Sequence, residues 1–277
     1  MNNKNETVYK VEEKSELLSF LFEKIENKSK NNIKTYLSNG QVLVNNKIMT
    51  KHDYIVFPND NVSVRLNYIK YDNNIDIVYE DNDFVVVDKP SNLLTISDNK
   101  GHVNLYSLVS NYVKRKNKNN KIFIVHRLDK DTSGLVLFAK NKEVKEYLQK
   151  YWNDKVDRFY FALVHNSPKD DVGILISYLK EDNNHYVYSS SDGEYASTYY
   201  EVINKKKSTT LLGLKLNTGK KNQIRVQLKD INCPIVGDKK YGIKDNNKEM
   251  CLYAYKISFI YKGKKYKFET KECKFYN

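Results

Sequence analysis

IFIVHRLDKDTSGLVLFAK, residues 122–140, is the stretch that decides the fold of this 277-residue chain. It opens with an apolar run, Ile122 to Val125, and closes with a second one, Leu135 to Ala139. The first run is rich in β-branched and aromatic residues, and the second follows Thr-Ser-Gly, so we predict two buried strands around a tight polar connection. Charged or titratable residues between core strands indicate a functional cleft mouth, with a solvated hairpin loop as the alternative. The connection holds five such residues: His126, Arg127, Asp129, Lys130 and Asp131.

This order of residues resembles the signature HRLDxxTSGLLLxA of the RluA family of pseudouridine synthases, with Val136 in place of one Leu. The resemblance implies that Asp129 is the catalytic nucleophile. It also implies that Arg127 fills the space left when the target base is flipped out of its stack, with support of the loop by hydrogen bonds as its alternative role. A motif of this length remains a hypothesis until its context agrees.

A phosphatase motif overlaps the same residues. Asp129-Lys130-Asp131-Thr132 fits DxDxT, the motif of the haloacid-dehalogenase class, in which the first Asp takes a phosphoryl group. That motif needs an apolar strand that runs directly into the first Asp, and His126 to Leu128 interrupt it here. We therefore rank the phosphatase interpretation below the synthase.

The composition allows a globular chain with one large domain and a small one, and 40% of its residues are hydrophobic. Lys+Arg 47 against Asp+Glu 34 give a formal net charge of +13, and the pI is near 9.3. This charge predicts a polyanionic partner, most simply RNA, although a general Lys and Asn bias of the sequence would also explain it.

The three cysteines, Cys233, Cys251 and Cys273, form no CxxC pair, so we expect neither a disulfide framework nor a zinc site. The polar N-terminus has no apolar core of a signal peptide, and no later apolar run is long enough to span a membrane. We predict a cytoplasmic monomer that binds no membrane and uses neither a metal nor another cofactor.

The first 66 residues predict a small module. Leu17, Leu18, Leu21, Phe22 and Ile25 lie on one face of a predicted helix, a second helix carries Ile33 and Leu37 inward, and residues 41–49 predict a hairpin around Asn45-Asn46. Residues 1–12 predict an edge strand and residues 60–64 a last strand. Helix, helix, Gly and a VxVNxK hairpin resemble the αL RNA-binding motif known from a small-subunit ribosomal protein. The resemblance implies that five lysines contact RNA phosphates, with a solvated surface as the alternative: Lys28, Lys30, Lys34, Lys47 and Lys51.

We predict a linker at residues 67–76 and a catalytic domain at residues 77–277. The strand at residues 84–89 leads into Lys89-Pro90, which resembles the family's opening motif, and Asn92 stands where that motif usually has Gly. Asn is the non-glycine residue that best tolerates a left-handed backbone, so we expect the turn to be kept. Later segments resemble the family's KxYxALV around Tyr160, with Arg158 for Lys, and its PxxGDxxYG at residues 234–242.

Residues 218–227 resemble the family's TGRxHQIRxH. Arg225 is retained, whereas Lys220, Asn222 and Gln227 replace Arg, His and His. The resemblance implies that Arg225 pairs with Asp129 and that Tyr160 lines the uracil pocket and can take the C5 proton, directly or through water. It also assigns further residues to substrate binding beside Arg127: His126, Thr132, Lys220 and Ile224.

Successive strands without long intervening helices predict an α+β fold, with a mixed, mainly antiparallel sheet and flanking helices, plus the small N-terminal α/β RNA-binding module. The resemblance implies a synthase that isomerises uridines in large-subunit ribosomal RNA, with transfer RNA as the alternative substrate. A non-catalytic RNA-binding or ribosome-assembly factor with a decayed synthase domain is the alternative from another class, and the departures at residues 220, 222 and 227 motivate it.

Overall fold

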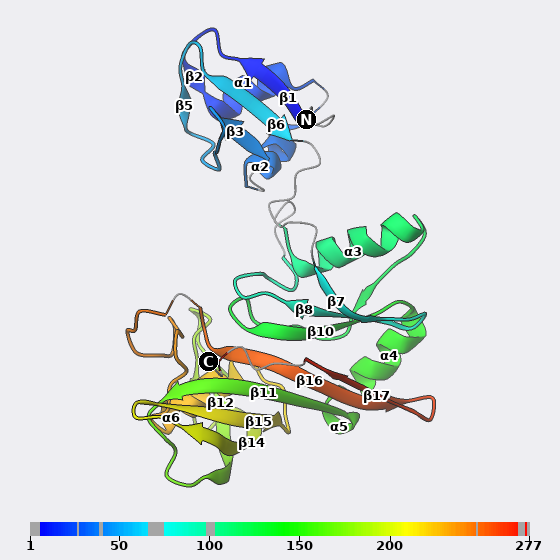
Figure 1. Cartoon of the computed structure of the whole chain (residues 1–277), viewed down its shortest axis with the longest axis vertical. Helices are drawn as coiled ribbons and strands as arrows, with labels where there is room; N and C mark the ends of the chain where they lie inside the picture. The colour runs from blue at the N-terminus through cyan, green and yellow to red at the C-terminus, as the bar shows by residue number, and fades with distance from the viewer. Residues whose placement is uncertain are drawn as a thin grey trace. The chain divides into compact units, whose positions relative to one another are not determined.

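The computed structural model describes residues 6–26, 28–38, 41–65, 75–97, 103–247, 249–270 and 275. The chain divides into two compact units, Met1–Ile75 with Ile96–Leu108 and Asp76–Thr95 with Val109–Asn277 (Figure 1). None of the helices in the described ranges is long and apolar enough to cross a membrane. Most of the predicted linker at residues 67–76 lies outside the described residues, and a strand already begins at Asp76.

The first unit contains the predicted helices and hairpin. A sheet in the order β1-β6-β3-β4 is antiparallel throughout, and β2 pairs with β5. Asn45 and Asn46 both have positive φ, 50° and 66°, which is the signature of a type I′ hairpin turn. The elements are β1 (Glu6–Lys10), β2 (Ser15–Glu16), α1 (Leu17–Lys24), α2 (Lys30–Ser38), β3 (Val42–Val44), β4 (Lys47–Ile48), β5 (Ile55–Val56) and β6 (Asn61–Arg65).

One face of α1 differs from the prediction. Ile33 and Leu37 of α2 are buried as expected, but Phe22 of α1 is 42% exposed, and Phe20 is buried in its place. The buried residues of α1 are Leu17, Phe20 and Leu21, which follow i, i+3 and i+4 spacing. The inward face is thus turned by part of a helical turn from the predicted one, because the apolar residues of α1 surround too much of the helix to fix its orientation.

The second unit is built on one large sheet. Its strand order is β13-β12-β14-β15-β11-β16-β10-β8-β7, with β17 paired to β16 and β9 to β10 (Figure 1). Every pairing is antiparallel except that of β10 with β16. The mixed, mainly antiparallel α+β fold is therefore confirmed. The strands are β7 (Asp76–Glu80), β8 (Phe84–Lys89), β9 (Phe123–Ile124), β10 (Ser133–Ala139), β11 (Val156–His165), β12 (Val172–Glu181), β13 (Val187–Ser189), β14 (Glu194–Lys205), β15 (Thr209–Leu216), β16 (Leu252–Tyr261) and β17 (Lys264–Glu269).

The helices of the second unit flank this sheet. They are α3 (Leu105–Lys116), whose first residues are assigned to the other unit, α4 (Lys142–Lys150), α5 (Trp152–Lys155) and α6 (Gln223–Asp230). In α6 the predicted inward residues Ile224 and Leu228 are buried, but Ile231 is 36% exposed. Ile231 is the C-cap residue, so it lies where the helical spacing no longer applies.

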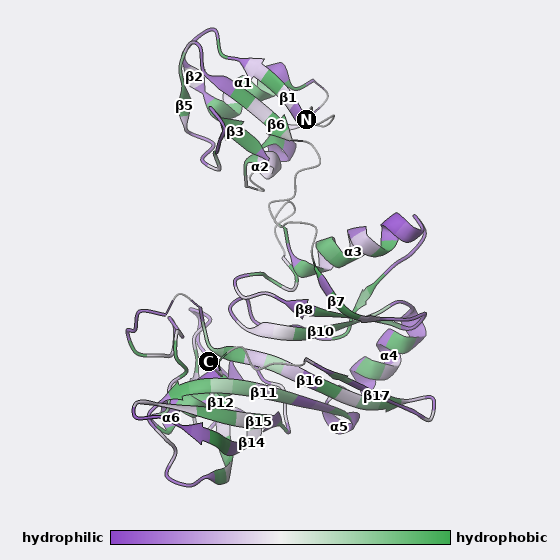
Figure 2. Ribbon diagram, viewed as in Figure 1, coloured by the Kyte–Doolittle hydropathy of each residue, from purple (hydrophilic) through white to green (hydrophobic). Residues whose placement is uncertain are grey.

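The stretch at residues 122–140 forms the predicted hairpin. All seven residues of β10 are buried, whereas β9 is a half-buried strand of two residues, Phe123 and Ile124. Hydrophobic residues colour much of β10 and β11 green in Figure 2, where the core of this unit lies. Gly134 has φ 116°, and a Cβ there would lie 2.4 Å from the carbonyl oxygen of Ala254. The Gly of the Thr-Ser-Gly sequence thus permits the close parallel contact of β10 with β16.

Candidate active site

The loop between β9 and β10 carries Asp129, and buried groups fix its backbone. Thr95 Oγ1 donates to the carbonyl oxygen of Leu128 at 2.9 Å and also accepts the Leu128 N–H at 3.2 Å. Ser91 Oγ donates to the carbonyl oxygen of Asp131 at 3.0 Å. Asn92 has φ 63°, so the turn after Lys89-Pro90 keeps the predicted left-handed residue.

Lys89 is the central support of this loop. Its side chain is fully buried, and its Nζ donates to the carbonyl oxygens of Pro90, Leu93 and Lys130 at 3.0, 2.8 and 3.1 Å. Burial lowers the pKa of Lys89 to about 8, although the nearby Asp129 and Asp131 favour its charged form. Sequence reasoning noted Lys89 only as part of a motif and did not predict that it holds the loop.

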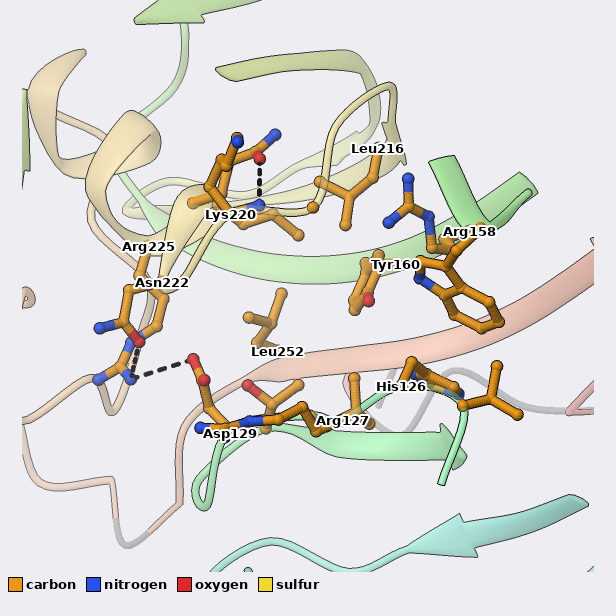
Figure 3. Close-up of a pocket in the computed structure, with 17 residues that line it drawn as sticks. His126, Arg127, Asp129, Arg158, Tyr160, Leu216, Lys220, Asn222, Arg225 and Leu252 are labelled. Atoms are coloured by element: carbon orange, nitrogen blue, oxygen red, sulfur yellow. Dashed lines mark hydrogen bonds and ion pairs between the residues drawn. The ribbon is translucent and has the colours of Figure 1, made fainter. Parts of the chain in front are cut away.

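Asp129 faces Arg225 across the cleft (Figure 3). Arg225 Nη1 lies 3.7 Å from Asp129 Oδ2, and the Arg225 guanidinium also makes two parallel hydrogen bonds to Asp238: Nε to Oδ2 at 2.8 Å and Nη2 to Oδ1 at 2.7 Å. A bidentate pair of this kind fixes a guanidinium plane in direction as well as in position. Arg225 is therefore held by Asp238 and directed toward Asp129.

The charges of this group support one another. Burial alone would lower the pKa of Arg225, but the hydrogen bonds and charge of Asp238, together with the charge of Asp129, raise it. Burial would likewise raise the pKa of Asp238, but Arg225 holds that pKa below its usual range. Asp238 also accepts the backbone N–H groups of Lys240 and Tyr241. The Asp of PxxGDxxYG is thus a support for Arg225 that sequence reasoning missed, although the motif itself was visible.

Tyr160 lies between Asp129 and Arg158 in the close-up of the cleft (Figure 3). Its ring comes from β11 and is 8% exposed. Burial raises the pKa of Tyr160 to about 12, with a smaller contribution from the charge of Asp129. A phenol with this pKa is uncharged at neutral pH and accepts a proton poorly.

His126 supports the loop from behind. Its Nε2 accepts the N–H of Leu137 at 3.0 Å, and its ring stacks on Trp152 with centroids 4.3 Å apart. Burial lowers the pKa of His126 to about 3, with the charge of Arg158 as a second cause. The neutral ring therefore carries its proton on Nδ1.

A cavity of about 280 Å³ lies between these groups. All the residues that were predicted to bind the substrate line it: Arg127, His126, Thr132, Lys220 and Ile224. Arg127 is exposed, Thr132 and Ile224 are buried, and Lys220 Nζ pairs with Glu194 at 3.0 Å. Other lining residues were not predicted as site residues, namely Trp152, Arg158, Leu216, Asn222 and Leu252. The replacement of Lys by Arg158 and the position of the chain's single Trp were the available signals.

Residues 83–230 match the family described as RNA pseudouridylate synthase. The chain belongs to this family. It is 33% identical over 266 residues to "Uncharacterized RNA pseudouridine synthase MG209" of Mycoplasma genitalium, covering 88% of this chain and 84% of the relative. It is also 32% identical to "Ribosomal large subunit pseudouridine synthase D" of Borreliella burgdorferi, covering 79% of this chain and 72% of the relative.

A solved structure shows the same fold as this pseudouridine synthase. Human RNA Pseudouridylate Synthase Domain Containing 4 matches with a TM-score of 0.62 and 21% identity, covering 72% of this chain and 89% of that one. The family consists of isomerases, so the phosphatase interpretation of DxDxT is excluded. The structure gives its physical reason, because β9 ends at Ile124 and does not run directly into Asp129.

Two of the three departures from TGRxHQIRxH, Asn222 and Gln227, have side-chain hydrogen-bond partners in the synthase, and the third, Lys220, pairs with Glu194. Asn222 has φ 53°, its Oδ1 accepts from Arg225 Nη1 at 3.2 Å, and its Nδ2 donates to the Tyr241 hydroxyl at 3.1 Å. Gln227 is buried and accepts from Thr198 Oγ1 at 2.6 Å, and three oxygen atoms lie within hydrogen-bond distance of its Nε2 amide group.

The five lysines that were predicted to contact RNA lie on the first unit. Lys28, Lys30 and Lys34 precede or belong to α2, and Lys47 and Lys51 belong to β4 and the segment after it. All five are exposed, and in the described part of the chain none of them forms an ion pair with an acidic side chain. Their contact with RNA remains a prediction, as does the division into an RNA-binding module at residues 1–66 and a catalytic domain at residues 77–277.

Proposed function

We propose that this chain isomerises specific uridines to pseudouridine in large-subunit ribosomal RNA, with Asp129 as the nucleophile. The observation that carries the proposal is the position of Asp129. Its carboxylate lies 3.7 Å from Arg225 at the wall of a base-sized cavity, on a loop that buried side chains hold in place.

The reaction needs an ionised carboxylate and a base that has left its stack. Arg225, itself held by Asp238, pairs with Asp129 and directs it toward the cavity. Asp129 attacks either the ribose C1′ or the base C6. Extrusion of the base opposes binding by roughly a few kcal/mol, and we assign to the exposed Arg127 the role of filling the vacated space. Tyr160 stacks on the uracil.

The proposed substrate rests on two observations. Relatives from Borreliella burgdorferi and Rickettsia prowazekii, 32% and 30% identical, are named ribosomal large subunit pseudouridine synthases D and C. The first unit also exposes lysines that suit phosphate contacts, and the chain carries a net charge of +13. We expect the enzyme to act as a cytoplasmic monomer. Transfer RNA is the alternative substrate.

Pseudouridine mapping tests the proposal. Total RNA from cells with the gene deleted, restored, or restored as Asp129→Asn is treated with carbodiimide, and reverse-transcriptase stops are compared. We expect one or a few large-subunit sites to disappear on deletion and to return only with the wild type. Sites in transfer RNA would change the substrate and keep the reaction. A ribosome-assembly defect that Asp129→Asn fully rescues, with no change in any site, would instead identify a non-catalytic binding factor.

A further inference from the structure

Arg158 lines the cavity, and its guanidinium lacks hydrogen-bond partners for two of its nitrogen atoms in the described part of the chain. It is 4% exposed, and its Nε and Nη2 atoms are buried without a hydrogen-bond partner among the described residues. Within the described ranges of the chain it also forms no ion pair. A buried guanidinium without a counter-charge is unfavourable for folding, so its retention in a wall of the cleft indicates a role in binding.

The surroundings of Arg158 leave its charge uncompensated. Trp152 lies beside it with the guanidinium carbon 5.9 Å from the ring, and His126 and Tyr160 are its titratable neighbours. Burial lowers the pKa of Arg158, but guanidinium groups stay protonated in proteins. His126 and Tyr160 are both neutral at pH 7, for the reasons given above. Asp157, the nearest acid along the chain, alternates to the exposed side of β11 and pairs with Lys215 at 2.8 Å.

The backbone places Arg158 on the side of the sheet that lines the cavity. Arg158 and Tyr160 alternate with Phe159 on β11 and so face the same side of the sheet. A register shift in the pairing with β16 falls between Phe159 and Tyr160, and such bulges redirect the side chains beside them. Figure 3 shows Arg158 on one side of Tyr160, with Asp129 and Arg225 on the other. A base that lies against Tyr160 and reaches Asp129 therefore extends toward Arg158.

We propose that the Arg158 guanidinium holds the carbonyl edge of the flipped uracil and stabilises the negative charge that the base carries while it is detached from the ribose. This inference rests on the proposed isomerisation. When the N1–C1′ bond breaks, its electron pair remains with the base and spreads over N1, O2 and O4. The C5–C1′ bond then forms, the bond between Asp129 and the nucleoside breaks, C5 loses its proton and N1 gains one, so the reaction balances without a co-reactant.

A base is a better occupant than a phosphate. The free nitrogen atoms of Arg158 are buried, whereas the phosphodiester groups next to a flipped nucleotide stay joined to the rest of the RNA outside the pocket. A uracil carbonyl accepts hydrogen bonds in the base plane, and it matches the planar guanidinium of a residue that lines the cavity. A fixed cation in a pocket poor in water also stabilises developing charge more strongly than water does.

The test uses the full chain and ribosomal RNA from the deletion strain, grown with uridine labelled with tritium at C5, because formation of pseudouridine releases this tritium. Single-turnover release at saturating enzyme is compared for the wild type, Arg158→Met and Arg158→Lys. Lys215→Met is the matched control, since it removes an exposed cation from the neighbouring strand β15. RNA affinity is measured separately by filter binding, and thermal melting follows the fold.

We expect Arg158→Met to slow tritium release roughly 100- to 1,000-fold, the range found when one donor to a developing oxyanion is removed. RNA affinity should stay within about twofold, and Arg158→Lys should be slowed about tenfold because a single charge remains without the planar fork. The melting temperature of Arg158→Met should equal or exceed that of the wild type, because an unpartnered buried charge is lost. Lys215→Met should resemble the wild type.

Different failures are distinguishable. No tritium release by the wild type would overturn the proposed function, and this inference with it. Wild-type release with an equal rate for Arg158→Met would overturn this inference alone. Loss of RNA affinity with an unchanged rate at saturation would overturn it in favour of a phosphate contact. A large fall in melting temperature, or failure of Arg158→Met to fold while Arg158→Lys folds and keeps the full rate, would show a structural role and overturn it as well.

Discussion

Arg225 and Arg158 lie on opposite sides of Tyr160 in the cleft, and the two are buried to nearly the same degree, 5% and 4% exposed (Figure 3). The Arg225 guanidinium has Asp238, Asn222 and Asp129 around it, whereas two nitrogen atoms of Arg158 have no hydrogen-bond partner in the part of the chain that the structure describes. The protein therefore supplies Arg225 with a full set of hydrogen-bond and ion-pair partners, whereas it supplies Arg158 with an incomplete set. A complete network rigidifies a nucleophile, and an incomplete one reserves its hydrogen bonds for a substrate.

The largest expected effect comes from breaking the buried ion pair of Arg225 with Asp238. Asp238→Asn removes the charge that compensates Arg225, and breaking a buried ion pair in this way lowers the free energy of unfolding by about 3–5 kcal/mol. Tritium release should fall as well, because Arg225 is no longer held toward Asp129. Urea denaturation measures the first effect, and the single-turnover assay measures the second.

Asp192→Asn is the control for this prediction. Asp192 pairs with Lys180 on the exposed surface, so its neutralisation should leave both quantities nearly unchanged. The stabilities of Asp238→Asn and Arg158→Met should differ in direction. Asp238→Asn is expected to lower stability, whereas Arg158→Met is expected to maintain or increase it. If Asp238→Asn and Arg158→Met destabilise the protein equally, the two arginines do not differ in the way proposed here.

The sequence predicted the surroundings of Arg225 better than those of Arg158. Asp129 and Arg225 were predicted from the resemblance of their segments to family motifs, and the Asn92 turn from a residue type that tolerates positive φ. The hairpin at residues 122–140 follows from the alternation of apolar and polar runs. The roles of Lys89 and Asp238 were missed, because each holds a backbone or side chain that only the folded chain brings close.

Arg158 shows why the rest could not be predicted. Its position on β11 was visible from strand alternation, but its lack of partners depends on where Trp152, Tyr160 and the register shift beside them come to lie. Absence of a partner is a property of the whole environment and leaves no local pattern. The same limit applies to α1, where the buried face is set by neighbouring elements and is centred on Phe20 rather than Phe22.

A prediction of intermediate size concerns the pH dependence of stability, which involves His126 next to Arg158. His126 has its pKa lowered to about 3 by burial and by the charge of Arg158. As pH falls below 6.5, the unfolded chain takes up a proton on His126 first, so stability is full above pH 6.5 and declines toward pH 3. We expect a loss of roughly 1–3 kcal/mol between pH 6.5 and 4.5 from this group, at about 1.4 kcal/mol per pH unit at most.

Urea midpoints at the two pH values measure this loss. His126→Gln lacks the titrating ring, so its stability should change less over the same range. Arg158→Met should also lose less than the wild type, because a cation no longer opposes protonation of His126, although burial of the ring remains the main cause. An identical pH dependence for the wild type and Arg158→Met would indicate that the charge of Arg158 is compensated in solution, contrary to the comparison.

The smallest expected effect comes from moving Arg158 without removing it. A Cβ at Gly219 would lie 2.5 Å from Arg158 Nη1, and the end of this flexible side chain can shift while the backbone stays. Gly219→Ala should therefore slow tritium release about tenfold, in keeping with the strong dependence of catalysis on position, and should change stability by less than about 1 kcal/mol. Gly213→Ala on β15 is the control, since its nearest contacts are the side chains of Ile203 and Glu201.

A double-mutant cycle decides whether Gly219 acts through Arg158. In the Arg158→Met background the guanidinium is absent, so Gly219→Ala should have no further effect on the rate. An equal slowing in both backgrounds would mean that Gly219 acts through the segment between β15 and α6, which also carries Lys220. The missing coupling would then remove the reason for treating the free donors of Arg158 as positioned for the base, while the fixed pair of Arg225 and Asp238 would be unaffected.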